Sequence, residues 1–150
     1  MPELPAVKRF LSDSGVRIYR IPYTFMFNLS GRVYLMLEAG PPTLVDAGSG
    51  QDVATRDIIA GLDSVRSQFG EKIRLGDVKR FLITHGHIDH VGGLWQLTRQ
   101  ATAQVVAHPL DRRRVAALEE QAVLADRALL RFLRQAGVPI RQQAEPAPAL

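Results

Sequence analysis

The chain contains no cysteine among its 150 residues. Disulfide bonds and thiolate metal sites are therefore excluded, and any metal must be held by nitrogen and oxygen ligands. No stretch approaches the roughly 18 apolar residues of a membrane span, and residues 1–9 lack the apolar core of a signal peptide. We therefore expect a soluble, cytoplasmic protein with no membrane partner.

A concentrated basic surface is also absent. The chain has 19 Lys and Arg against 15 Asp and Glu, a net charge of +4 that is spread along the sequence. A nucleic-acid interface would need a clustered basic face with aromatic residues. The one local run, residues 112–114, is three arginines in a helical pattern and is typical of a solvated helix face. The composition therefore argues against nucleic acid as a partner.

Short strands are predicted in the first third of the chain. Apolar residues alternate with polar ones in residues 16–21, and similar short runs follow at 32–38 and 43–46, separated by turn residues. We expect residues 1–15 to be an irregular segment and Pro22 to end the first of these strands. Three strands joined by tight turns predict an antiparallel start to a sheet.

Helical periodicity begins at residue 52. Residues 52–69 carry apolar side chains at helical spacing, with Asp52 as a candidate cap and Gly70 as a candidate end. The remaining predicted elements are a strand at 79–84, a helix at about 89–99, a strand at 103–107, a long amphipathic helix at 110–135 and a Pro/Ala-rich tail at 141–150. Strands followed by alternating helices and strands indicate an α/β (α+β) layered fold.

Three of the four histidines fall within six residues. His85 and His87 follow the strand at 79–84, and Asp89 and His90 lie at the start of the next helix. Residues two apart on an extended segment point the same way, so His85 and His87 can bind one metal together. Asp89 and His90 could complete that site or hold a second ion. Imidazole and carboxylate favour Zn²⁺, one or two ions, and also accept iron or manganese.

This ligand set indicates metal-assisted hydrolysis. A catalytic metal needs about three protein ligands and an open position for water, whose pKa falls towards 7 on binding. Hydrolysis would then need no serine or cysteine nucleophile. A mononuclear iron site for redox chemistry uses the same ligand types and remains an alternative.

The motif at residues 85–90 resembles the His-x-His-x-Asp-His signature of the metallo-β-lactamase-fold hydrolases. Residues 44–48, Leu-Val-Asp-Ala-Gly, resemble that family's upstream Leu-Val-Asp-x-Gly segment, and residues 105–109 look like its following strand. The resemblance implies an αββα sandwich with the site at one edge of the sheets. It implies that His85 and His87 bind a first metal, that Asp89 and His90 bind a second, with Asp89 also the candidate catalytic residue, and that Asp46 orients a ligand by hydrogen bonding.

The later ligands of the family pattern are missing. The family supplies a further histidine, a bridging aspartate and a final histidine, but after residue 90 this chain has only His108, and its later aspartates are Asp111 and Asp126 in the helical stretch. We therefore expect residues 16–140 to be the N-terminal portion of such a domain, the first sheet with its helices, with 141–150 a tail or truncation point. A single sheet would expose an apolar face, so we expect a second chain or an oligomer to cover it.

Three functions follow from the resemblance. The first is a metal-dependent hydrolase of the glyoxalase II type, acting on a small ester, thioester or lactone as its small-molecule substrate and needing the missing C-terminal half. The second is a phosphodiesterase or nuclease on the same fold. The third is a truncated remnant without catalytic activity.

Overall fold

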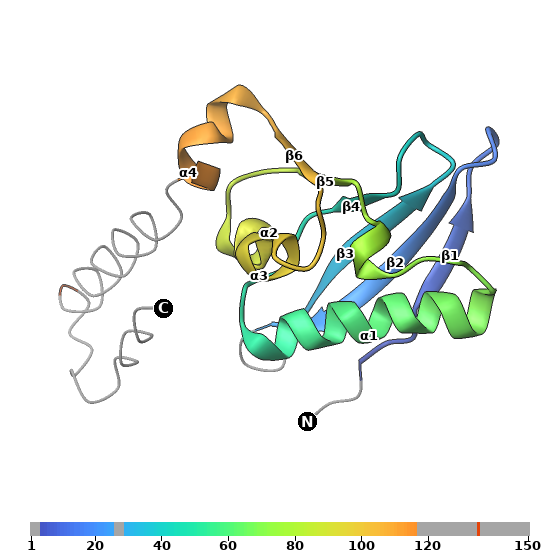
Figure 1. Cartoon of the computed structure of the whole chain (residues 1–150). Helices are drawn as coiled ribbons and strands as arrows, with labels where there is room; N and C mark the ends of the chain where they lie inside the picture. The colour runs from blue at the N-terminus through green and yellow to red at the C-terminus, as the bar shows by residue number, and fades with distance from the viewer. Residues whose placement is uncertain (1–3, 26–28, 117–134, 136–150) are drawn as a thin grey trace. The chain divides into compact units, whose positions relative to one another are not determined.

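Six strands form one mixed sheet, in which spatial order follows chain order (Figure 1). The computed structural model describes residues 4–25, 29–116 and 135, and residues up to Val115 belong to one unit. The strands are β1 (Lys8–Leu11), β2 (Arg17–Thr24), β3 (Ser30–Leu37), β4 (Thr43–Val45), β5 (Arg80–Ile83) and β6 (Gln104–Ala107). β1 to β4 pair antiparallel, whereas β4, β5 and β6 run parallel. The predicted α/β class and the antiparallel start are confirmed.

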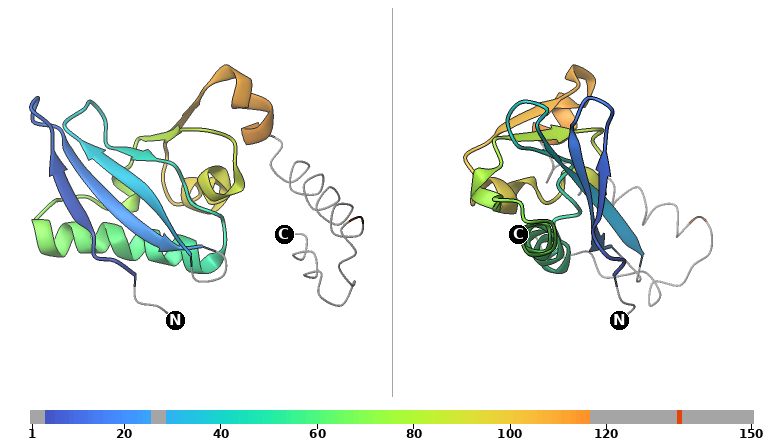
Figure 2. Two further views of the ribbon diagram at one scale, coloured as in Figure 1. Left: turned by 180° about the vertical axis from the view of Figure 1, so that it is seen from behind. Right: turned by 90° about the vertical axis from the view of Figure 1, so that its right-hand side faces the viewer.

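The helical elements follow the parallel strands. They are α1 (Asp52–Phe69), η2 (Leu75–Asp77), α2 (Ile88–Val91), α3 (Leu94–Thr98), η3 (Pro109–Asp111) and α4 (Arg112–Ala116). α1 connects β4 to β5, and a crossover of this length is what parallel pairing requires. Figure 2 shows α1 and the α2–α3 pair on the same side of the sheet. Among the described residues, no helix is long and apolar enough to cross a membrane.

Two expectations about the first strands are wrong. The segment 1–15 contains β1, whose four residues are all exposed, so the strand forms through backbone pairing with β2 and carries no hydrophobic alternation. β2 continues through Pro22 to Thr24. Beyond Arg20, β2 has a neighbour only on its β3 side, and proline is tolerated at such an edge because its missing N–H need not remove a ladder bond.

α1 spans the residues that its periodicity predicts. Gly70 ends it in the left-handed conformation (φ 72°), and its N–H donates to the Arg66 carbonyl. The cap differs from the expectation: Gln51 is the N-cap residue, and Asp52 lies in the first turn, where its charge favours the helix dipole.

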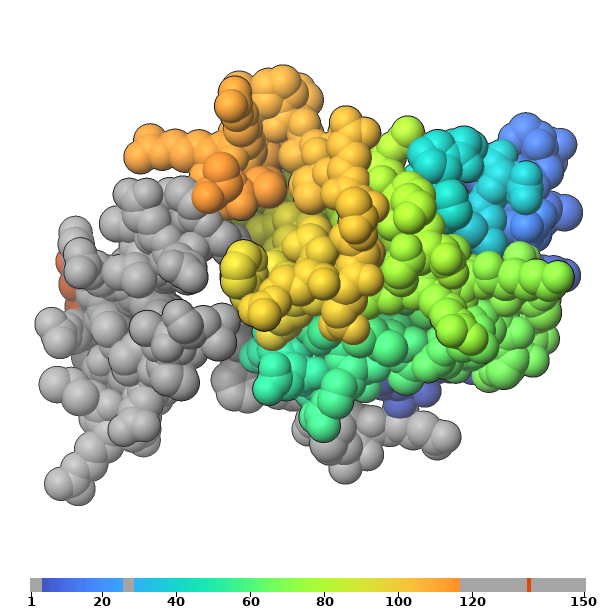
Figure 3. All heavy atoms as spheres, in the orientation of Figure 1, coloured from blue at the N-terminus to red at the C-terminus, as the bar shows by residue number. Residues whose placement is uncertain are grey.

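The core lies between α1 and one face of the sheet. The largest fully buried side chains on that face include Tyr19, Ile21 and Leu35. Gly61 allows the close approach, because a Cβ there would lie 2.2 Å from Cγ2 of Ile21. The surface of α1 continues into that of α3 in the space-filling view (Figure 3), and the Thr55 hydroxyl donates to Oε1 of Gln96 at 2.5 Å between them.

The opposite face of the sheet carries an apolar row. Tyr34, Val45, Leu82 and Val106 are register partners across four strands, so their side chains share this face. Each is half-buried or exposed, with Leu82 37% exposed. An exposed apolar face of this kind is the one for which the sequence predicts cover by a second chain or an oligomer.

The helix predicted at about 89–99 is instead two short helices, α2 and α3, with a turn at Gly92 and Gly93. The Gly93 N–H donates to the Gly48 carbonyl at 3.0 Å instead of continuing α2. Backbone bonds to the β4–α1 loop therefore replace the helical ladder at this point. Of the helix predicted at 110–135, α4 covers Arg112–Ala116; residues 117–134 and the tail at 141–150 lie outside the described residues.

Candidate metal site

The candidate site lies where β4 and β5 end. Asp46 directly follows β4, and Thr84 directly follows β5. Because these strands are parallel neighbours, their carboxyl ends meet at the same edge of the sheet. Residues 84–87, the histidine turn, lead from β5 into α2, so the four predicted ligands are gathered at this edge.

Asp46 connects Thr84 and His90 through hydrogen bonds to its carboxylate. The residue is buried, only 5% exposed, and its carboxylate accepts hydrogen bonds from the Thr84 N–H at 2.8 Å, from the Thr84 hydroxyl at 2.9 and 3.0 Å, and from Nδ1 of His90 at 2.8 Å. Its backbone is left-handed (φ 64°), a conformation that aspartate tolerates better than most residues, and its N–H donates to the Leu82 carbonyl at 2.9 Å. These bonds fix the carboxylate between the two strand ends.

The Asp46 carboxylate decides the proton position on His90. An ionised carboxylate can only accept hydrogen bonds, so Nδ1 of His90 must carry the proton. In the neutral imidazole, Nε2 then keeps its lone pair, which is the form that ligates a metal. This Nε2 lies 3.3 Å from Oδ2 of Asp89, so the two groups face one another.

His85 and His87 form a second pair of donor groups. Nε2 of His85 lies 3.0 Å from Nδ1 of His87, and the two rings are edge to face with centroids 4.6 Å apart. Two nitrogens bound to one tetrahedral zinc at 2.0–2.1 Å stand about 3.3 Å apart. The His85–His87 and Asp89–His90 spacings are both close to this value, and the rings of His85 and His90 lie 4.0 Å apart.

The candidate metal ligands are therefore spaced as two pairs, His85 with His87 and Asp89 with His90, and each pair could bind one ion through two side chains. Within the described ranges, no group of three or more His, Asp and Glu side chains is arranged to hold a metal ion. A catalytic zinc takes three protein ligands, so each pair is one ligand short.

Tyr23 reaches the site from β2 and is not singled out by any sequence motif. The residue is 2% exposed, and its hydroxyl donates to the backbone carbonyl of Asp89 at 2.6 Å. Burial raises the pKa of Tyr23 to about 12, with the negative charges of Asp89 and Asp46 adding to the effect. The hydroxyl therefore stays protonated and remains a donor over the whole neutral range.

The segment after β6 contributes groups that the sequence analysis did not assign to the site. Oδ1 of Asp111 accepts from the Gly86 N–H at 3.1 Å. A Cβ on Gly86 would lie 2.7 Å from Cβ of Arg114, so the stem of this arginine packs against the turn between the two histidines. His108 instead caps η3, its Nδ1 accepting from the Leu110 N–H at 3.3 Å.

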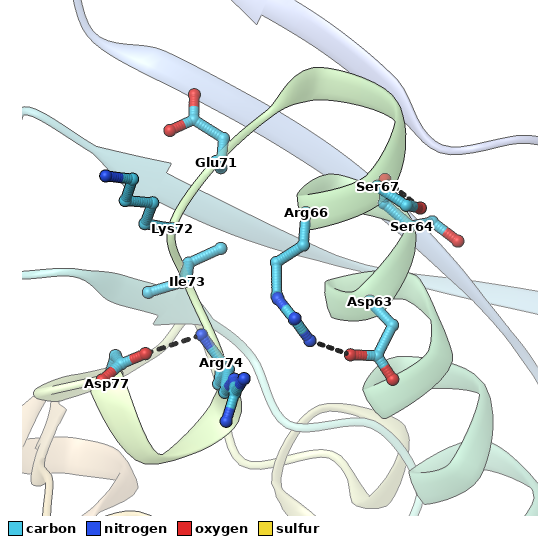
Figure 4. A pocket seen from close by; sticks show the side chains of 9 residues that line it. All are labelled: Asp63, Ser64, Arg66, Ser67, Glu71, Lys72, Ile73, Arg74 and Asp77. Atoms are coloured by element: carbon cyan, nitrogen blue, oxygen red, sulfur yellow. Dashed lines mark hydrogen bonds and ion pairs between the residues drawn. The ribbon is translucent and has the colours of Figure 1, made fainter.

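A separate hollow lies away from these residues. It has a volume of about 780 Å³ and lies between the last turns of α1 and residues 71–77 (Figure 4). Its charged groups are partly paired: Arg66 binds Asp63 at 2.9 Å, and Asp77 accepts from the Arg74 N–H at 2.8 Å. Asp63, Glu71 and Asp77 line the hollow, but among the described residues no three such side chains are placed to hold a metal ion together.

Comparison with known proteins decides the family. The sequence model of the metallo-beta-lactamase superfamily matches residues 27–142. The chain belongs to the metallo-beta-lactamase superfamily. This confirms the resemblance carried by residues 44–48 and 85–90, and it supports metal-dependent hydrolysis as the chemistry of the family.

Solved structures of this superfamily share the fold. The Rm3 metallo-beta-lactamase is 27% identical with a TM-score of 0.52, over 71% of this chain and 34% of its own. A metallo-beta-lactamase family protein from Thermus thermophilus is 24% identical with a TM-score of 0.60, over 81% of this chain and 38% of its own. The chain thus spans little more than a third of the length of these two relatives. No curated protein matches it.

Proposed function

We propose that this chain carries one half of the metal site of a hydrolase that acts on a small ester, thioester or lactone, as in glyoxalase II-like members of the superfamily. The main support is the pairing of donors at one sheet edge, with the Nδ1 proton of His90 fixed by Asp46 at 2.8 Å. Such a contact sets the tautomer of a ligand before any metal binds.

The residues divide into two ion positions. His85 and His87 hold one ion, and Asp89 and His90 hold the second, with Zn²⁺ the favoured metal for this donor set. A divalent ion bound there would lower the pKa of a coordinated water towards 7. The side chain of Asp89 is 35% exposed, so its carboxylate can also accept a hydrogen bond from a water or a substrate hydroxyl. The third ligand of each ion would come from protein outside the described residues.

Metal titration tests this assignment. The metal-stripped chain is titrated with Zn²⁺ or Co²⁺ by calorimetry, alongside His85→Ala, His87→Ala and the control His108→Ala. His108 is the matched control because it is the fourth histidine and caps η3. We expect His85→Ala and His87→Ala to weaken binding at least tenfold and His108→Ala to bind as the unsubstituted chain does. Equal binding by all four proteins would refute the site.

One observation favours a phosphodiester substrate as a second candidate. The stem of Arg114 packs on Gly86, which brings an arginine to the histidine turn, and Arg112 and Arg113 share its short helix. Binding of a short RNA whose affinity falls steeply between 50 and 200 mM salt, and falls further in Arg114→Ala, would favour this candidate. Thioester or lactone hydrolysis that is insensitive to Arg114→Ala would favour the first.

A further inference from the structure

The short helix α2 depends on tertiary contacts for its orientation. A four-residue helix has too few internal hydrogen bonds to persist alone. Its carbonyls have three different partners: Ile88 accepts from the Gly92 N–H at 2.8 Å, Asp89 from the Tyr23 hydroxyl at 2.6 Å, and His90 from the Ala47 N–H at 2.7 Å. Tyr23 supplies the side-chain contact in this set.

The ring of Tyr23 has little freedom to move. Tyr23 and Gly31 are register partners on β2 and β3, and a Cβ on Gly31 would lie 2.1 Å from Cζ of the ring. A Cβ on Gly48 would lie 3.7 Å from the ring on another side. The hydroxyl is therefore delivered to one place by a buried, close-packed ring.

The bonded carbonyl belongs to a proposed ligand and adjoins another. The Asp89 carbonyl lies on the peptide that links Asp89 to His90, so a bond to it restrains the backbone of both residues. Gly93 cannot take this role, because its N–H donates to the Gly48 carbonyl. Without the hydroxyl, the Asp89 carbonyl has no donor within α2.

We propose that Tyr23 is a positioning residue for the second ion, because its hydroxyl holds the peptide between Asp89 and His90. This inference rests on the proposed function. Tyr23 acts through the backbone of the ligands and does not touch the ion. Removing the Tyr23 hydroxyl should therefore reduce the free energy of metal binding more than it reduces the free energy of unfolding.

The variant Tyr23→Phe removes only the hydroxyl and keeps the ring. Tyr19→Phe is the matched control, because Tyr19 is a buried residue of the same strand whose hydroxyl donates to Glu71, away from the histidine turn. Co²⁺ and Zn²⁺ affinities of the three proteins are measured together with amide hydrogen exchange of the metal-free forms. Cooperative thermal melting establishes that each variant is folded.

We expect Tyr23→Phe to bind metal about tenfold more weakly at the Asp89–His90 position, which corresponds to about 1.4 kcal/mol. The amides of Val91 and Gly92, which close α2, should exchange faster in this variant only. Tyr19→Phe should retain both the affinity and the α2 protection of the unsubstituted chain.

Two outcomes would count against the inference, and they can be told apart. If the unsubstituted chain binds metal and Tyr23→Phe binds it equally well, the positioning role is wrong and the proposed function stands. If the unsubstituted chain binds neither Co²⁺ nor Zn²⁺, the proposed function fails and the positioning role fails with it.

Discussion

Gly93 should be a position where a single methyl group destabilises the candidate site. Its backbone is right-handed (φ −80°, ψ −4°), so alanine meets no conformational penalty there. The obstacle is space: a Cβ would lie 2.1 Å from the carbonyl oxygen of Ala47 and 3.2 Å from its carbon. Gly93→Ala therefore tests how tightly the α2–α3 turn packs on the β4–α1 loop.

The size of the effect follows from what must move. Real Cβ atoms do not approach within 3.0 Å of such an oxygen, so one of the two backbone segments must shift by about 0.9 Å or more. Both segments are tied, by Ala47 N–H to the His90 carbonyl at 2.7 Å and by Gly93 N–H to the Gly48 carbonyl at 3.0 Å. Overpacking of this kind costs about 1–3 kcal/mol, and losing one of these bonds adds about 1 kcal/mol. We expect Gly93→Ala to lower the free energy of unfolding by about 2–4 kcal/mol.

Thermal and urea unfolding, followed by circular dichroism, measure this change. For a chain of this size, each kcal/mol shifts Tm by about 4 °C, so a fall of about 8–16 °C is expected. Gly76→Ala is the matched control, because the nearest atom to its added Cβ would be the Gln100 carbonyl oxygen at 3.7 Å. The control should stay within about 0.5 kcal/mol of the unsubstituted chain. If Gly93→Ala has the same Tm and free energy of unfolding as Gly76→Ala, the turn at Gly93 does not pack closely on the Ala47 carbonyl.

Three further predictions concern Glu71, Asp46 and Leu82. Burial raises the pKa of the Glu71 carboxyl, but hydrogen bonds from Tyr19 and Arg17 outweigh this and lower it overall. Because the pKa of Glu71 is lower in the folded state than its unfolded value near 4.5, its carboxylate stabilises the folded state above that value. This stabilisation is lost as the pH falls through the lowered folded-state pKa. Glu71→Gln should therefore flatten the acid side of a stability–pH profile, and an unchanged profile would contradict this. Asp46→Asn can no longer accept from both Thr84 and His90, so it should cost about 1–3 kcal/mol in urea unfolding and weaken Zn²⁺ binding, whereas unchanged values would deny Asp46 its central place. If a second copy of the chain covers the apolar row, Leu82→Glu places a charge in that contact and should reduce self-association in sedimentation velocity; self-association equal to that of the unsubstituted chain would show that the row is not the contact surface.

The sequence predicted elements whose side chains repeat with a clear period. α1 has the predicted bounds, since its buried residues Ile58, Leu62 and Val65 fall at helical spacing and a glycine follows its last turn. The grouping of Asp46 with the histidine turn was also predictable, although only through the family motifs, since periodicity does not reveal which strands become neighbours. Parallel pairing of β4 with β5 supplies that juxtaposition physically.

Features that depend on tertiary backbone contacts could not be predicted from the sequence. β1 has no buried residue, so no alternation marks it. The break between α2 and α3 arises because the Gly93 N–H bonds to the carbonyl of Gly48, in a loop far earlier in the chain. No motif marks Tyr23 in the sequence, because its contact with α2 is a hydrogen bond to the Asp89 carbonyl, 66 residues later in the chain.

The candidate metal site is held by the sheet and by the segments that follow β4 and β5. Asp46 joins the ends of two parallel strands to His90, and Tyr23 and Ala47 bind the carbonyls of α2. These contacts lie within residues 23–90, so the described part of the chain supplies the contacts that position Asp89 and His90. The number of ligands, rather than their arrangement, should then limit affinity: two protein ligands per ion should bind far more weakly than the four of a structural zinc site, which contribute about 10–16 kcal/mol. Supplying one further imidazole or carboxylate to either pair should therefore raise metal affinity with little change in the turn itself.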